Sequence, residues 1–114
     1  MQRRLQKLTL LLPLVAGCAS RPGSIGAVLG QSKTDGRVVI RQAPVGLPAF
    51  NVGMLPGDEV LLIEGRDVRQ MSPETIHYAL EGDVGTIVHL TVLSRGQIER
   101  LALKRAPLLP TGAP

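Results

Sequence analysis

The sequence is poor in the residues that build disulfides and aromatic surfaces. Its 114 residues include one cysteine, no tryptophan, one tyrosine and one phenylalanine. A single cysteine excludes a disulfide within the chain. An aromatic content of 2% argues against a surface that stacks the bases of a single-stranded nucleic acid. The chain is long enough for one domain, and its 44% apolar and 19% charged residues indicate a globular rather than a disordered protein.

The charge of the chain is nearly balanced once its N-terminal segment is set aside. The formal net charge is +4. Three of the thirteen basic residues, Arg3, Arg4 and Lys7, lie in a segment that we expect to be removed, which leaves ten basic against nine acidic residues. A chain this close to neutral gives no basis for binding nucleic acid or an acidic membrane surface through charge.

The N-terminal apolar run is too short for a membrane-spanning helix. It covers residues 8–16, about nine positions, whereas a span needs ~20. A basic start, a short apolar stretch and small residues are typical of a secretory signal. The residues that follow, Val15-Ala16-Gly17-Cys18, resemble the lipobox of bacterial lipoproteins. An ordinary signal peptide with an incidental cysteine, or a buried N-terminal helix, would be the alternatives.

The lipobox resemblance implies a lipid anchor. Cys18 would carry a diacylglycerol on its thiol after removal of the signal peptide 1–17, and residues 18–23 would form the lipidated end and a tether. Two or three acyl chains hold a protein on a membrane lastingly, which one chain does not. Ala19 stands where inner-membrane retention usually shows Asp, so the resemblance favours the outer membrane facing the periplasm, with a Gram-positive cell surface as the other possibility.

Short β-branched or alternating runs bounded by turn residues predict a sheet. A single helical turn is expected at 48–52. Residues 25–29 and 37–41 form a predicted hairpin around Asp35-Gly36. The other predicted strands cover residues 60–63, 66–68, 86–93 and 98–103.

The clearest helix begins after Ser72. The Ser72 hydroxyl is a good N-cap, and Pro73 suits the first helical position. Apolar residues then recur at helical spacing, at Ile76, Ala79 and Leu80. Gly82 is predicted to stop the helix. The sum is an α+β fold, a small partly open β-barrel of five or six strands with one main helix and one short helix.

Three motifs in the middle of the chain carry a family resemblance. They are Pro48-Ala49, Gly53-Met54-Leu55-Pro56-Gly57-Asp58 and Val60-Leu61-Leu62-Ile63-Glu64-Gly65. Together they closely resemble the central motif of PDZ domains. The order of elements resembles the bacterial, circularly permuted type of tail-specific and high-temperature-requirement proteases. The resemblance covers residues 24–106, with residues 107–114 left as a disordered Pro-rich tail.

PDZ domains bind peptides, usually C-termini, by adding them as a strand to a sheet edge. The resemblance implies that the loop 24–27 holds the terminal carboxylate on its backbone N–H groups and that Ile25, Ala27 and Val28 begin the pairing strand. It also implies that one helix face forms the opposite wall. The implied peptide-binding residues are Ser24, Ile25, Gly26, Ala27, Val28, Pro73, His77 and Leu80.

The chain departs from the family pattern at three of these positions. Ser24 replaces the common first glycine of the loop, and Ala27 replaces a larger apolar residue, which predicts a roomier pocket for the last ligand side chain. Pro73 stands where Ser/Thr-selective domains have histidine, so that selectivity is not expected. Ser24 lies six residues beyond Cys18, and six extended residues reach at most ~20 Å, which would place the groove near the lipid headgroups.

No other pattern in the sequence predicts catalytic or metal chemistry. His77 and His89 are the only histidines, too few for a zinc site. His77 is either a groove contact or a half-exposed helix residue, and His89 is expected in solvent. The nucleophile elbow of serine hydrolases is missing around Ser32, Lys33 and Ser94, and Ser32 and Lys33 are expected in the hairpin loop. No cofactor, no metal and no nucleic acid are therefore expected.

These observations predict a lipid-anchored, non-catalytic PDZ module of the bacterial envelope. It would act as an adaptor or scaffold that binds protein C-termini or extended peptides. Two alternatives remain: a regulatory or substrate-delivery subunit of a separate envelope protease, and a structural docking piece of a secretion or envelope complex. An enzyme is a third and weaker reading.

Overall fold

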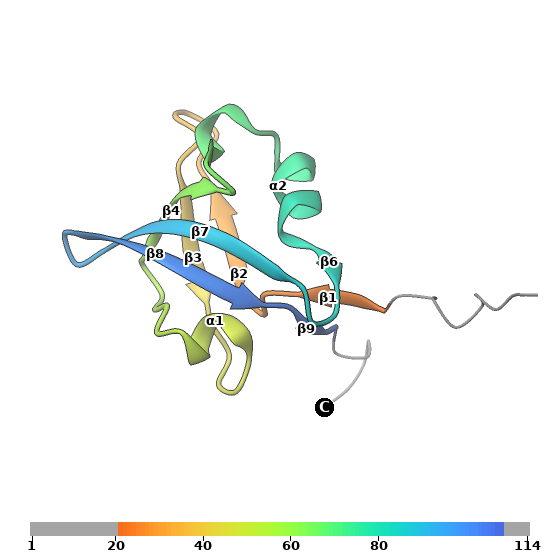
Figure 1. Ribbon diagram of the computed structural model, residues 1–114. Coiled ribbons are helices and arrows are strands. Elements are labelled where there is room, and N and C mark those ends of the chain that lie inside the picture. The colour runs from red at the N-terminus through yellow and green to blue at the C-terminus, as the bar shows by residue number, and fades with distance from the viewer. Residues whose placement is uncertain (1–20, 109–114) are drawn as a thin grey trace, which may run out of the picture.

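The computed structural model describes residues 21–108, which form two antiparallel sheets and two α-helices (Figure 1). The signal peptide predicted over 1–17, the lipidation site Cys18 and residues 109–114 lie outside the described residues. The main sheet has the strand order β2-β3-β4-β7-β8, with β5 paired to β4. Its strands are β2 (Val28–Gln31), β3 (Val38–Gln42), β4 (Glu59–Ile63), β5 (Arg66–Asp67), β7 (Ile87–Ser94) and β8 (Gln97–Lys104).

Two of the hairpin connections are two-residue turns with left-handed backbone. Glu64-Gly65 joins β4 to β5 with φ of 49° and 78°, and Arg95-Gly96 joins β7 to β8 with φ of 50° and 79°. Positive φ at both positions matches the twist of the strands on either side.

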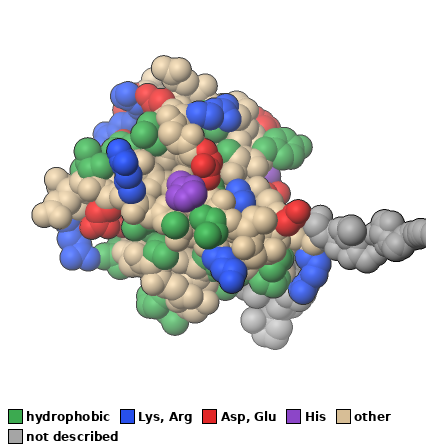
Figure 2. Space-filling view, in the orientation of Figure 1, with side chains coloured by type: hydrophobic (Ala, Val, Ile, Leu, Met, Phe, Trp, Pro, Cys, Tyr) green, Lys and Arg blue, Asp and Glu red, His purple; other side chains and the backbone are tan. Residues whose placement is uncertain are grey.

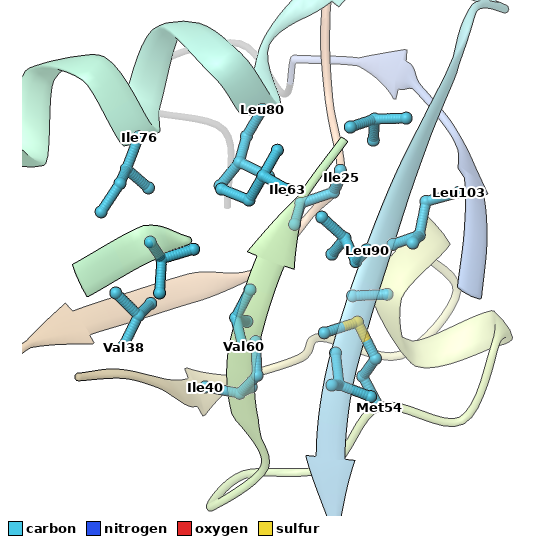
Figure 3. Close-up of a cluster of buried hydrophobic side chains, with 14 of the residues drawn as sticks. Ile25, Val38, Ile40, Met54, Val60, Ile63, Ile76, Leu80, Leu90 and Leu103 are labelled. Carbon is cyan, nitrogen blue, oxygen red and sulfur yellow. The ribbon is translucent and has the colours of Figure 1, made fainter. Parts of the chain in front are cut away.

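The core lies on the inner face of the main sheet. Val88, Leu90 and Val92 alternate along β7 and are at most 1% exposed, in agreement with the strand predicted over 86–93. Met54, from the loop after α1 (Pro48–Asn51), and Leu103 of β8 pack around them (Figure 3). The core closes on the other side under helix α2 (Pro73–Leu80), through Ile76 and Leu80.

Helix α2 begins as predicted and ends differently. The Ser72 hydroxyl accepts a hydrogen bond of 3.1 Å from the Thr75 amide, and Pro73 fills the first helical position. Gly82 was predicted to end the helix, and this prediction is wrong. The helix ends at Leu80, because the next residue, Glu81, is already extended, with φ −82° and ψ 160°. Gly82 then belongs to strand β6 (Gly82–Asp83), and its φ is not positive.

The predicted strands 25–29 and 66–68 are each partly wrong. Strand β2 starts at Val28, because Gly26 has φ of 69° and turns the chain before the ladder begins. Val68 belongs to a short 3-10 helix, Val68–Gln70, rather than to a strand. The Asp67 carboxylate caps that helix by accepting from the Arg69 amide at 2.9 Å.

A second, small sheet was not predicted. It has the order β6-β1-β9, with β1 (Pro22–Ser24) between β6 and β9 (Ala106–Pro107). Pro22 and Gly23 had been assigned to the tether, and Pro107 to the tail. Strands of two or three residues that contain proline and glycine leave no alternation to detect, so only their pairing in space defines them.

Candidate functional site

An elongated hollow of about 400 Å³ lies between strand β2 and helix α2. Figure 1 shows β2 at the side of the main sheet that faces this helix. The loop 24–27 lines one part of the hollow, β2 supplies one wall and α2 the other. Seven of the eight sequence-predicted site residues line it: Ser24, Ile25, Gly26, Ala27, Pro73, His77 and Leu80.

Strand β2 is an edge strand. Among residues 21–108 it pairs only with β3, in the register Leu29↔Ile40 and Gln31↔Val38. Its other edge therefore presents backbone N–H and C=O groups without a strand partner in this range. Such an edge is a template onto which another extended chain can pair.

The loop 24–27 is held in place from both sides. The Ile25 side chain is 2% exposed in the core, and the Ile25 carbonyl accepts a hydrogen bond of 2.9 Å from the Ala49 amide of α1. Gly26 must be glycine, since its φ is positive and a Cβ there would lie 2.5 Å from the Leu47 Cβ. The loop is thus a rigid turn rather than a flexible linker.

The amides of this loop have few acceptors of their own. The Gly26 amide donates to the Ser24 hydroxyl at 3.2 Å. Outside the strand ladders, the Ile25 and Ala27 amides find no backbone acceptor within the part of the chain that the structure describes. Successive backbone N–H groups in a concave turn suit an anion such as a carboxylate.

Helix α2 presents both apolar and polar side chains to the hollow. Ile76 and Leu80 are 5% and 7% exposed and form its apolar floor. His77 and Glu81 also line it, and the His77 Nε2 lies 2.9 Å from a Glu81 carboxylate oxygen. The two readings of His77 are compatible, because its side chain lines the hollow and is still 67% exposed.

Seven further residues line the hollow and were not among the predicted site residues: Leu29, Gly30, Gln31, Val38, Ile76, Glu81 and Leu108. The Gln31 side chain donates to the Met71 carbonyl at 3.0 Å and so ties β2 to the segment before α2. Leu108 had been assigned to the tail. Only the three-dimensional pairing of β9 with β1 brings it to the hollow, so the sequence carried no signal for it.

Val28 is the one predicted site residue that does not line the hollow. Its side chain is 47% exposed and faces a separate, smaller depression of about 220 Å³ behind the loop, together with Pro44 and Leu47. The bulge between Val28 and Leu29 shifts the register at this point. Its backbone begins strand β2, whereas the predicted pairing strand began at Ile25.

Comparison with known proteins identifies the fold. No family model and no curated protein matches the sequence. A solved PDZ domain of a carboxy-terminal protease from Vibrio cholerae, in complex with peptide, is 28% identical, with a TM-score of 0.63 over 77% of this chain and 96% of that one. The chain has a PDZ-like fold. The α+β fold expected from the sequence is thereby confirmed.

Two whole proteases contain a similar PDZ-like part. The photosystem II D1 C-terminal processing protease is 22% identical over 82% of this chain, with a TM-score of 0.71, and 25% of its own length is covered. The HtrA-type protease AlgW, solved with a decapeptide, is 19% identical over 77% of this chain, with a TM-score of 0.65 and 30% of its length covered. The chain thus spans a quarter to a third of these two proteases.

Neither a membrane-spanning helix nor a metal-binding cluster occurs among residues 21–108. No helix between residues 21 and 108 is long and apolar enough to cross a membrane. The same range holds no group of three or more His, Cys, Asp or Glu side chains that could bind a metal ion. Basic and acidic side chains are interspersed on the face shown in Figure 2, as the near-neutral composition predicts.

Proposed function

We propose that this PDZ-like domain binds protein C-termini or extended peptides by β-strand addition. The observation that carries the proposal is the unpaired edge of β2 facing α2 across a hollow. A peptide would pair antiparallel to β2 and extend the main sheet by one strand. The relatives solved with a bound peptide and decapeptide support this mode.

The terminal carboxylate of the ligand would sit at the loop 24–27. The Ile25, Gly26 and Ala27 amides would donate to it, and the Ser24 hydroxyl would release the Gly26 amide to do so. The last ligand side chain would enter the apolar floor at Ile76 and Leu80. Backbone pairing would supply most of the affinity, and this pocket would determine which C-terminal residue of the ligand is preferred.

We further propose that the domain is a non-catalytic adaptor held on a bacterial membrane. The support is the lipobox-like sequence ending at Cys18, a few residues before β1. The groove would then lie near the outer-membrane surface, facing the periplasm, and its ligands would come from membrane-adjacent proteins. Mass spectrometry of the protein from bacterial membranes would detect the acyl chains, and Cys18→Ala should abolish them and release the protein.

Peptide binding is tested with the full chain in detergent and a library of free C-terminal peptides. We expect micromolar or weaker dissociation constants, about −8 kcal/mol or smaller in magnitude. The matched control is each peptide with an amidated C-terminus, which should bind at least about tenfold more weakly because it lacks the carboxylate. A folded protein that binds no member of the library would overturn the proposal.

A second candidate is a regulatory or substrate-delivery subunit of a separate envelope protease. The similarity to a part of two whole proteases favours it over a purely structural docking role. Co-purification from detergent extracts discriminates between them. A protease partner would support the regulatory role, whereas complexes that survive Ala27→Trp would support docking through another surface.

A further inference from the structure

Arg105 connects the C-terminal end of helix α2 to the strands beneath it. Its Nε donates to the Leu80 carbonyl at 2.9 Å, and its Nη2 lies 3.2 Å from the Ala79 carbonyl. Its Nη1 donates to the Thr86 hydroxyl at 2.9 Å. One guanidinium therefore satisfies two carbonyls at the end of α2 and a side chain at the start of β7.

These bonds matter because α2 is short and has no left-handed cap. The last carbonyls of a helix have no partner within the helix, and a positive charge there is favourable. In α2 the residue after the last turn, Glu81, is already extended, so the Arg105 side chain takes the place of a backbone cap. Arg105 therefore bonds directly to two carbonyls of this last turn.

The backbone beside Arg105 contacts the segment that leads into the loop 24–27. The Arg105 amide donates to the Thr86 carbonyl at 2.8 Å, and its carbonyl accepts from the Gly85 amide at 2.9 Å. The next residue, Ala106, pairs with Ser24 in the β1–β9 ladder, and Ser24 opens the loop 24–27. The same short segment therefore touches α2 through its side chain and the loop through its backbone.

Two glycines make room for this arrangement. A Cβ on Gly82 would lie 2.8 Å from the Arg105 Cζ, and a Cβ on Gly23 would lie 3.1 Å from the Arg105 Cβ. Gly23 and Gly82 are also direct partners in the β1–β6 ladder. Neither glycine has a positive φ. Glycine is therefore needed at these positions for the close approach of Arg105 and its strand, and not for the backbone conformation.

We infer that Arg105 is a positioning residue that sets the distance between the last turn of α2 and the loop 24–27. This distance fixes the width of the pocket for the terminal side chain of the ligand, because Leu80 and Ala27 line the hollow from its two sides. Arg105 does not line the hollow and acts through α2. The inference rests on the proposed peptide binding and names the residue that tunes its specificity.

The test compares two variants of Arg105. Arg105→Met keeps the apolar part of the side chain and removes every N–H donor. Arg105→Lys keeps the positive charge but lacks the planar guanidinium that bonds several acceptors at once. Arg100→Met is the matched control, since Arg100 is an exposed arginine on β8. Peptides ending in Ala, Val and Phe are measured well below the unfolding temperature. For Arg105→Met we expect the affinity for the best peptide to fall roughly 5- to 30-fold. The dissociation constants of the three peptides should also differ less from one another than in wild type. Arg105→Lys should be intermediate, and Arg100→Met should stay within about twofold.

A second measurement needs no ligand. The amide NMR signals of Ile25, Gly26 and Ala27 should shift in free Arg105→Met, although the Arg105 side chain makes no hydrogen bond to them in the described structure. If wild type binds no peptide, these shifts still report whether Arg105 positions the loop, so the two failures are distinguishable. A folded Arg105→Met with unchanged loop signals and an unchanged order of terminal preference would overturn the inference.

Gly82→Ala covers the case in which Arg105→Met does not fold. Its new Cβ would displace the guanidinium without altering Arg105 itself. We expect the amide NMR signals of the loop 24–27 to shift as in Arg105→Met. The dissociation constants of peptides with different terminal residues should likewise differ less than in wild type. Loop signals and terminal preference that stay as in wild type would contradict the inference.

Discussion

The hydroxyl of Ser94 donates a hydrogen bond of 2.8 Å to the carboxylate of Asp58, from the far end of β7. Asp58 is 6% exposed and is the one buried charged or polar side chain among residues 21–108. Its other carboxylate oxygen accepts from the Leu55 amide at 2.9 Å, across the turn 55–58. One side chain thus fastens the central Pro-Gly turn to the main sheet.

Replacing Asp58 with alanine should destabilise the protein by about 1–3 kcal/mol, because the Leu55 amide and the Ser94 hydroxyl both lose their partner. Urea unfolding measures the change. Asp83→Ala, at an exposed position on β6, is the control and should cost less than about 0.5 kcal/mol. Equal effects of the two substitutions would show that the buried contacts contribute nothing.

Replacing Arg95 with asparagine should stabilise the protein by roughly 0.5–1 kcal/mol. Arg95 has φ of 50° in the β7–β8 turn, a conformation that asparagine adopts more readily than arginine. A higher thermal midpoint would confirm the expectation. Gln97→Asn, at the first residue of β8, is the matched control and should not raise the midpoint.

Replacing Ala27 with tryptophan should block the groove. Ala27 lines the hollow, and an indole there would occupy the space of the last ligand side chain. We expect at least a roughly tenfold loss of peptide affinity with little change in stability. Val28→Trp is the matched control, because the neighbouring side chain faces the depression behind the loop instead. Equal losses in both variants would argue against the groove as the binding site.

Glu64 should make stability depend on pH in the acid range. The backbone amide of His89 donates to its carboxylate at 2.8 Å, and this contact lowers the pKa of Glu64 below its ordinary value. A lowered pKa in the folded state means that the contribution is present above the unfolded pKa and is lost as pH falls through the folded one. The unfolding midpoint of wild type should therefore drop more steeply than that of Glu64→Gln below about pH 4. Parallel curves would contradict this assignment.

Most of the main sheet and both helices could be predicted from local signals. The alternation of Val88, Leu90 and Val92 and the Ser72 cap each depend on neighbours in the chain. The small sheet could not be predicted, because β1, β6 and β9 are defined by contacts between segments far apart in the sequence. The same reason hid Leu108 from the predicted site.

The backbone positions of the candidate site could be predicted from the family resemblance, whereas the orientation of individual side chains could not. The loop 24–27 and three positions of α2 come together around one hollow. The side chain of Val28 could not be placed, since a bulge at the start of β2 turns it away. The role of Arg105 could not be predicted either, because its side chain bonds to the end of a helix more than twenty residues earlier in the chain.

Strand β1 carries a mechanical consequence, because the chain enters the described domain through it. Only its short ladders with β6 and β9 hold it, and it leads directly into the loop 24–27. A force applied at Arg21 would act first on these ladders, which are much shorter than the pairing of β7 with β8. Pulling at this end would therefore deform the loop 24–27, the proposed seat of the terminal carboxylate, at a lower tension than is needed to unfold the main sheet.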